Sequence, residues 1–150
     1  MKILVMSDSH AGLSFMRLCI RAVKPDAMIH LGDYFEDGKN MAEEFPHIPM
    51  HQVPGNCDRY RCPPFVQEIE IRKFDGVNMY LTHGHHASPD ALPPLVKGSV
   101  FLSGHTHVKL DKEVDGIRCL NPGSVSIPKD GSHSCLIFED GEFRFHIWED

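Results

Sequence analysis

Apolar and polar positions divide the first half of the chain into short apolar runs separated by segments of helical periodicity. The runs at residues 2–6, 27–31 and 48–53 predict buried strands. Between them, apolar residues recur at helical spacing over 12–24, and a shorter helical segment covers 39–45; a proline follows each of these two segments directly. Strands and helices that alternate in this way favour a parallel β-α-β-α-β unit.

The second half of the chain predicts antiparallel hairpins. Three Asp-Gly pairs each lie between two runs of strand-forming residues, and Asp-Gly is the strongest short hairpin signal. The predicted strands are 65–71 with 77–83, 108–114 with 117–120, and 133–139 with 142–148, together with a lone strand at 100–102. Residues 88–98 predict one short helix interrupted by prolines. We therefore expect one α/β domain over residues 1–150, with two packed sheets and a few helices.

Composition narrows the function classes. The 150 residues are 41% hydrophobic and 24% charged, as is ordinary for a globular protein, and the net charge of -6 argues against a broad nucleic-acid or anionic-membrane surface. The five cysteines are odd in number and include no Cys-x-x-Cys pair, which argues against a disulfide framework or a zinc finger. The apolar start is too short for a signal peptide and no segment has spanning length, so we expect a cytoplasmic protein.

Side chains that can bind metals follow five of the predicted strands. In open α/β sheets, ligands bind at the carboxyl ends of the strands. Each fragment alone is weak, because an aspartate or histidine after a strand often belongs only to a turn or a solvated loop. Five such strand ends in one chain are hard to reach by chance. The seven residues are Asp8, His10, Asp33, Asn56, His83, His105 and His107.

The chemistry of this set favours two metal ions. Seven nitrogen and oxygen ligands are too many for one tetrahedral zinc with an open position. They suit two ions about 3.5–4 Å apart that share a bridging carboxylate. Many imidazoles disfavour calcium and magnesium and fit manganese, iron, zinc, cobalt or nickel.

The motifs DSH, GD, GNCD, THGH and GHTH, in this order, closely resemble those of the calcineurin-like metallophosphoesterase superfamily. They are most similar to its small single-domain bacterial phosphodiesterase branch, and NPGSVSIP at 121–128 is similar to that branch as well. The resemblance implies a four-layer α-β-β-α sandwich with a mixed parallel and antiparallel pair of sheets. It also implies two ligand sets that share Asp33. One metal would be held by Asp8, His10, Asp33 and His107, and the other by Asp33, Asn56, His83 and His105.

The resemblance further implies a phosphodiesterase that hydrolyses a small phosphodiester by attack of a metal-bridging hydroxide, with manganese the favoured ion. The catalytic residues would be Asn56, Cys57 and His83. Many members of the superfamily have histidine at the position of Cys57, where it can protonate the leaving oxygen. A thiol is a weak donor, so substrates with good leaving groups are favoured here.

Two other functions and several neighbouring residues stay open on the sequence alone. The first alternative is a catalytically weak scaffold for protein contacts on the same fold, and the second is a phosphomonoesterase or nucleotidase; a homo-oligomer is compatible with either. Asp58 is expected to orient its loop or a histidine, with a helix cap as the alternative. His85 either orients a neighbour, faces substrate or stabilises a turn, and His86 is expected to be solvated. Arg59 and Arg61 could guide phosphate, but lone arginines are more often solvated.

Overall fold

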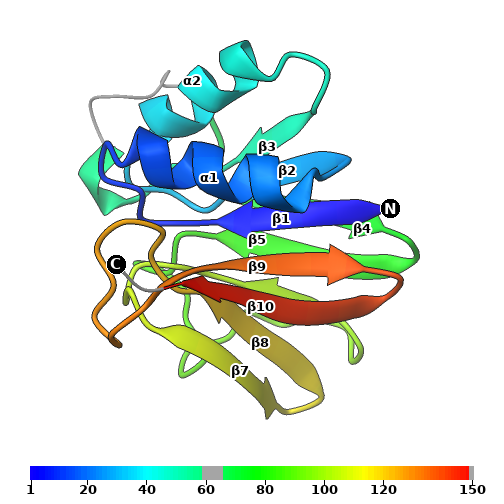
Figure 1. Cartoon of the computed structure of the whole chain (residues 1–150). Coiled ribbons are helices and arrows are strands. Elements are labelled where there is room, and N and C mark those ends of the chain that lie inside the picture. The colour runs from blue at the N-terminus through cyan, green and yellow to red at the C-terminus, as the bar shows by residue number, and fades with distance from the viewer. Residues whose placement is uncertain (59–65, 149–150) are drawn as a thin grey trace.

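The computed structural model describes residues 1–58 and 66–148 as two five-stranded sheets packed face to face, with both helices on the outside of one of them (Figure 1). Arg59 and Arg61 lie outside the described residues, as does the start of the predicted strand 65–71. The α/β class with two mixed sheets is confirmed.

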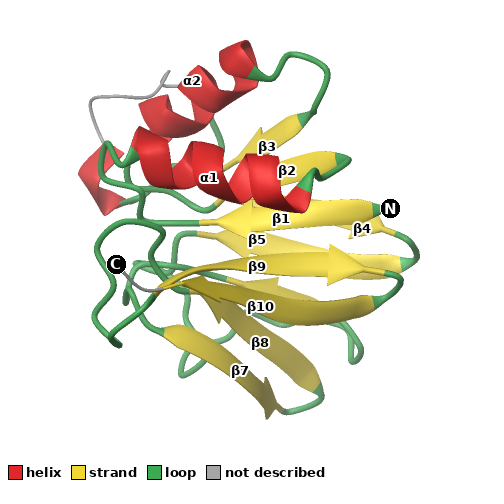
Figure 2. Ribbon diagram, viewed as in Figure 1, coloured by secondary structure: helices red, strands yellow, loops and turns green. Residues whose placement is uncertain are grey.

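The first sheet contains the predicted parallel unit. Its strand order is β10-β9-β1-β2-β3, and β1 pairs in parallel with β2, which pairs in parallel with β3. The last hairpin adds β9 antiparallel to β1. Helices α1 and α2 cover its outer face (Figure 2). The bounds are β1 Lys2–Met6, α1 Leu13–Val23, β2 Ala27–His30, α2 Phe35–Glu44, β3 Met50–Gln52, β9 His133–Glu139 and β10 Glu142–Trp148.

The second sheet contains the other two predicted hairpins, in the order β4-β5-β6-β8-β7. Its first strand runs later than the predicted 65–71, because the tight turn at Asp75 and Gly76 pairs Phe74 with Val77 and so extends the ladder to the turn. Strand β6 pairs in parallel with both β5 and β8. The bounds are β4 Ile69–Phe74, β5 Val77–Thr82, β6 Val100–Leu102, β7 Lys109–Val114 and β8 Ile117–Pro122, and a short 3₁₀ turn covers Asn56–Asp58.

Helix α2 begins at Phe35, four residues before the predicted segment 39–45. The backbone N–H of Phe35 donates to Oδ1 of Asp58 at 2.8 Å, so a residue 23 positions away satisfies the start of the helix. Glu36 and Asp37 lie in the first turn, where negative charge suits the positive end of the helix dipole. Periodicity within the segment could not locate this start, because its partner is distant in sequence.

The predicted helix at 88–98 is wrong: the segment forms turns and extended chain. Ser88 and Ala91 pair across a tight turn, and the two adjacent prolines that follow have no N–H to donate to a helix. Leu92 and Leu95 nevertheless pack on the outer face of the second sheet, where a helix was expected. The layer order of the predicted sandwich is thus kept, with a non-helical segment in the fourth layer.

Side chains along each strand point alternately to the two faces of its sheet, and this alternation divides the core into layers. In β1, Ile3 and Val5 face the second sheet, whereas Leu4 and Met6 face the helices. These side chains are fully buried, which fixes the register of the central strand. A rigid central strand holds the loop that follows it, and that loop carries the first two candidate ligands.

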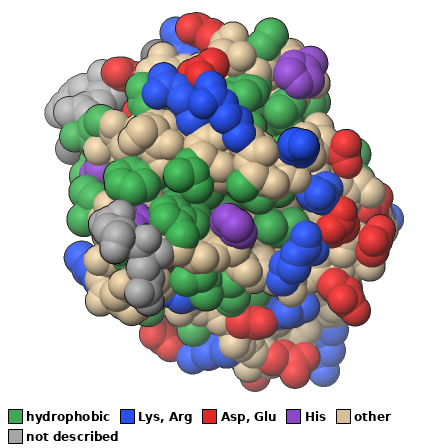
Figure 3. Space-filling view, viewed as in Figure 1, with side chains coloured by type: hydrophobic (Ala, Val, Ile, Leu, Met, Phe, Trp, Pro, Cys, Tyr) green, Lys and Arg blue, Asp and Glu red, His purple; other side chains and the backbone are tan. Residues whose placement is uncertain are grey.

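The surface agrees with the modest negative charge. On the face shown in Figure 3, Lys and Arg side chains are interleaved with Asp and Glu, and no single basic patch covers that face. Within the described part of the chain, no helix is long and apolar enough to span a membrane.

Candidate metal centre

All seven predicted ligands lie where the carboxyl ends of five strands meet. The loops after β1, β2 and β3 of the first sheet face the loops after β5 and β6 of the second. The two loop groups are joined directly, because the His83 ring contacts the carbonyl of Leu31 and the backbone N–H of His105 donates to Asp8. Hydrogen bonds between the sheets therefore set the spacing of the side chains.

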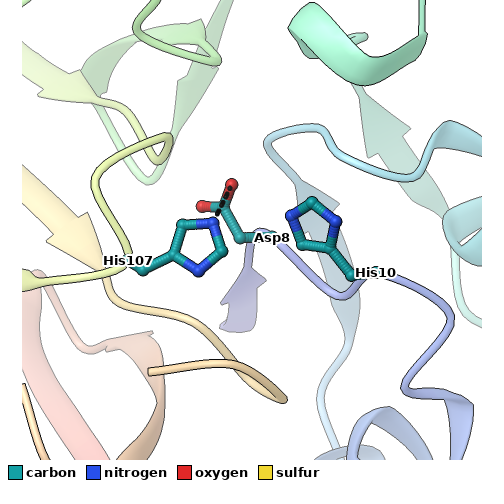
Figure 4. A group of neighbouring side chains, drawn as sticks. All are labelled: Asp8, His10 and His107. Carbon is teal, nitrogen blue, oxygen red and sulfur yellow. Dashed lines mark ion pairs between the residues drawn. The ribbon is translucent and has the colours of Figure 1, made fainter. Parts of the chain in front are cut away.

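One cluster consists of Asp8, His10 and His107 (Figure 4). One ligand atom from each lies within 4.8 Å of the others. Oδ1 of Asp8 is buried and lies 3.4 Å from Nε2 of His107. Neither this oxygen nor the buried Nε2 of His10 has a hydrogen-bond partner among the described residues. Buried polar atoms without partners are costly, and a shared cation would satisfy both.

The backbone fixes the orientation of His107. Its Nδ1–H donates to the carbonyl oxygen of Ile127 at 2.6 Å, because a carbonyl can only accept. The lone pair of the neutral ring is then on Nε2, the atom that faces Asp8. This is the arrangement expected of a metal-binding histidine.

A second cluster gathers around His83. Its Nδ1–H donates to the carbonyl of Leu31 at 2.8 Å, which leaves the lone pair of the neutral ring on Nε2. That atom lies 3.0 Å from Oδ1 of Asn56, 3.2 Å from Nδ1 of His105 and 3.4 Å from Oδ2 of Asp33. A lone pair on Nε2 and the Asn56 oxygen cannot hydrogen-bond to each other, but a cation could bind both.

Asp33 lies between the two clusters. Its Oδ2 is 3.4 Å from Nε2 of His83 and 3.7 Å from Nε2 of His10. Asp8 also reaches both clusters, since its Oδ1 is 3.8 Å from Nε2 of His83. The sequence assigned only Asp33 to both ligand sets, so the shared position of Asp8 is new.

Electrostatics distinguish the two carboxylates. Burial raises the pKa of Asp8 above its ordinary value, although His83, Ser7 and His107 act in the opposite direction. Burial also opposes ionisation of Asp33, but His83 and the N–H of Cys57 outweigh it and hold its pKa well below the ordinary value. Asp8 is therefore the carboxylate that most needs a cation to stay ionised.

Two buried aspartates position the ligand loops. Asp58 accepts hydrogen bonds from the backbone N–H groups of Asp33, Phe35 and Gly55, so it orients its loop, as expected, and also caps the start of α2, which was the alternative. Asp37 accepts from the Ser9 hydroxyl at 2.6 Å and from the N–H of Ala11 at 2.7 Å. The second aspartate thereby holds both neighbours of His10. Sequence analysis missed Asp37, because it lies in a segment that was not predicted to be helical.

His30 completes this support from the core. The N–H of Gly32 donates to its Nδ1, so its Nε2–H donates to the Ser9 hydroxyl at 2.8 Å. Burial lowers the pKa of His30 to about 3, and in the metal-free protein, where the pKa of His83 is raised, the charge of a protonated His83 acts in the same direction. His30 is thus a buried core histidine with both ring nitrogens hydrogen-bonded.

The loop with His105 and His107 is not a strand. Both residues have left-handed backbone angles, with φ of 76° and 62°. His105 faces Asn56 and His83, whereas His107 faces Asp8, so the two rings point into different clusters. A Cβ at Gly104 would collide with the Ser7 hydroxyl, which explains the glycine at this close approach.

Cys57 and His85 lie at the edge of these clusters. The Cys57 side chain is exposed, and its backbone N–H donates to Oδ1 of Asp33 at 2.9 Å. The His85 ring lies 5.5 Å from that of His83 between centroids. His86 is exposed, as predicted. Glu68 lies beside both histidines, a proximity that the sequence did not suggest.

Comparison with known proteins decides the family. A model of the calcineurin-like phosphoesterase superfamily domain matches residues 1–141. The chain belongs to this superfamily. The probable metallophosphoesterase of Mycoplasma pneumoniae is 30% identical over an alignment of 138 residues that covers 85% of this chain and 81% of that protein.

Phosphodiesterase YfcE of Escherichia coli K12 is 29% identical over 156 residues, covering 88% of this chain and 83% of that protein. A solved structure of YfcE aligns with 93% of this chain and 89% of that chain, at a TM-score of 0.80 and 25% identity. Vps29 of Entamoeba histolytica, solved in complex with Zn²⁺, shares the fold at a TM-score of 0.68 and 21% identity, over 99% of this chain and 98% of that chain. As a calcineurin-like phosphoesterase, the protein is a metal-dependent phosphoric ester hydrolase.

Proposed function

We propose that this calcineurin-like phosphoesterase is a phosphodiesterase that uses two divalent transition-metal ions, with manganese the favoured ion. The observation that carries the proposal is the position of Asp33, whose Oδ2 faces His10 on one side and His83 on the other. A carboxylate between two groups of imidazoles is what a two-metal site requires. The first ion would be held by Asp8, His10, Asp33 and His107, and the second by Asp33, Asn56, His83 and His105.

The residues present fit such ions. Two ligand atoms of one ion with bonds of about 2.0–2.2 Å are about 2.8–3.6 Å apart, the shorter distances for an octahedral ion such as manganese and the longer for a tetrahedral one. The separations of 3.4 Å between Asp8 and His107 and between Asp33 and His83 lie in this range. Bound divalent ions supply positive charge that orients a phosphate and lowers the pKa of water toward about 7.

The protein's own groups prepare this chemistry. The Nδ1–H of His83 and that of His107 each donate to a backbone carbonyl, so the Nε2 lone pair of each neutral ring stays directed at the centre. Asp37 and Asp58 hold the loops of His10 and Asp33 in place. The seven candidate ligands include no lysine or arginine. Positive charge that attracts an anionic ester would therefore come mainly from the bound ions.

The preference for diesters rests on Cys57 and on YfcE, a relative named as a phosphodiesterase. Without an imidazole after Asn56, proton delivery to the leaving oxygen is weak, and esters with good leaving groups are favoured. This also makes a phosphomonoesterase or nucleotidase the less suited alternative. A scaffold without catalysis has no need of the filled ligand set, and here all seven positions carry a ligand.

A panel of esters tests the proposal. The manganese-loaded protein is assayed on an activated aryl phosphodiester, the matching aryl phosphomonoester and an alkyl phosphomonoester. The proposal predicts the highest kcat/KM on the aryl diester. A higher kcat/KM on the monoester would favour the phosphomonoesterase alternative, and no turnover of any ester by a metal-loaded protein would favour the scaffold.

A further inference from the structure

Beyond the seven ligands, a second group of metal-binding side chains lies beside the centre. We propose that Glu68, His85 and His86 form an accessory site for a third divalent transition-metal ion, which we call the rim site. One ligand atom from each residue lies within 4.8 Å of the others. The rim site does not depend on how many ions the main centre holds.

The pairing of β4 with β5 brings the three residues together. Ile69 lies opposite Thr82 in the ladder, so the residue before β4 and the residues after β5 leave the sheet side by side. Glu68 directly precedes β4, and His85 and His86 come shortly after the end of β5. A register fixed by six residue pairs thus places a carboxylate beside two imidazoles.

The spacing of the atoms suits a shared ion better than direct hydrogen bonds. Nε2 of His86 lies 3.4 Å from Oε2 of Glu68, and Nε2 of His85 lies 3.8 Å from Oε1. These separations are longer than ordinary hydrogen bonds of about 2.7–3.2 Å. They are close to the roughly 3.3–3.6 Å expected between two ligands of one tetrahedral ion. Each histidine faces a different oxygen of the same carboxylate, so an ion could contact all three side chains with small movements.

The His85 ring is held in place on the side of the centre. Its centroid lies 4.1 Å from that of His86, 5.5 Å from that of His83 and 6.4 Å from that of His105. Its Nδ1 is buried and has no hydrogen-bond partner among the described residues, so packing against the neighbouring rings, and not a hydrogen bond of Nδ1, positions the ring. The packed ring limits the entropy lost when Nε2 binds an ion.

The donor set indicates the class of ion. Two imidazoles and one carboxylate with open positions form the ligand set of several zinc enzymes, and imidazole disfavours Ca²⁺ and Mg²⁺. The site therefore takes Zn²⁺ or a similar borderline ion such as Ni²⁺ or Co²⁺. The side chain of His86 is 64% exposed and that of Glu68 is 56% exposed, so water competes and binding is weaker than at the buried centre.

The test counts bound Zn²⁺ in matched variants. The full chain is dialysed to equilibrium against increasing Zn²⁺, and zinc per chain is measured by elemental analysis for wild type, His86→Ala and Glu68→Gln. His47→Ala removes an exposed histidine on a different loop, between α2 and β3, and controls for weak binding at any surface imidazole. Circular dichroism verifies that each variant keeps its fold.

The rim site predicts that wild type and His47→Ala bind one more Zn²⁺ at saturation than His86→Ala does. In Glu68→Gln, the affinity for this additional Zn²⁺ should be reduced at least about tenfold. Equal zinc content in folded wild type and His86→Ala would overturn the proposal, as would an equal loss in His47→Ala. The measured quantity is a difference of one ion, so an unexpected number of ions at the main centre would count against the proposed function and leave the rim site standing.

Discussion

Oδ1 of Asp8 lies 3.4 Å from Nε2 of His107, and both atoms are directed at the same point by hydrogen bonds made elsewhere in each side chain. The Ser7 hydroxyl and the N–H of His105 donate to the other oxygen of Asp8, which leaves Oδ1 without a donor. A neutral His107 likewise offers only a lone pair. Two acceptors that face each other in a buried position are unfavourable, and a metal ion or a proton between them removes the conflict.

The bridging position of Asp33 predicts different metal losses in two variants. Asp33→Asn should reduce occupancy in both clusters, because Oδ2 faces His10 and His83. His107→Ala should mainly reduce occupancy in the cluster of Asp8 and His10. Loss of a residue that only supports a metal ligand typically lowers metal affinity roughly 10–100-fold, and loss of a ligand itself should lower it at least as much. Metal per chain, measured after dialysis at a fixed ion concentration, distinguishes them. Full loading of Asp33→Asn in both clusters would show that Asp33 is not a bridge.

Asp37 should act on activity through His10. Asp37→Asn removes the carboxylate that holds Ser9 and Ala11, so His10 loses its fixed position, and we expect metal affinity at that cluster to fall about 10–100-fold. Glu43→Gln changes an exposed acid on the same helix and should leave affinity unchanged. Titration of both variants with Mn²⁺, with hydrolysis as the readout, makes the comparison. Recovery of Asp37→Asn to full rate at high Mn²⁺ supports a positioning role; a rate that stays low at saturating Mn²⁺ contradicts it.

Cys57 should contribute little as an acid. Cys57→Ser should change rates only slightly, since a hydroxyl is no better a donor than the thiol. Cys57→His introduces a group of pKa about 6.5 beside Asn56, and we expect a gain on the order of 10- to 100-fold on esters with poor leaving groups. A leaving-group series on all three proteins measures both effects. A large and uniform loss in Cys57→Ser would mean that the thiol itself takes part in a step.

His30 should make stability fall in mild acid. Its pKa is about 3 in the folded protein, because of burial and the charge of His83, against about 6.5 unfolded. A lowered folded pKa contributes stability above pH 6.5, which is lost as the pH falls toward 3. Between pH 7 and pH 5, His30 alone should cost about 2 kcal/mol.

Urea unfolding of the metal-free protein at the two pH values tests the role of His30. His30→Gln should show a fall smaller by that amount, whereas the exposed control His47→Ala should match wild type. An equal fall in wild type and His30→Gln would exclude His30 as the source.

Much of the fold and of the site followed from short-range patterns. The apolar run at 2–6 and the Asp-Gly turns define β1 and the hairpins, because strand periodicity and turn conformation are local properties. The seven candidate ligands could be named because each follows a strand, and parallel strands bring their carboxyl ends to one edge.

Contacts between distant segments account for what the sequence did not reveal. The start of α2 depends on Asp58, and the support of His10 depends on Asp37, whose partners lie 26 and 28 positions away. The helix expected at 88–98 failed because prolines override a weak apolar periodicity. The proximity of Glu68 to His86 depends on the register of β4 and β5, which a single residue of slip would change.

The central claim is that the clusters around Asp8 and Asp33 hold two catalytic metal ions, and the metal content of the purified protein tests it most directly. At a free Mn²⁺ concentration that supports full hydrolysis, elemental analysis should find two ions per chain; a chelator should abolish hydrolysis, and Mn²⁺ should restore it. Folded protein that hydrolyses the aryl diester at full rate after removal of all bound metal, or that binds no metal, would contradict the account.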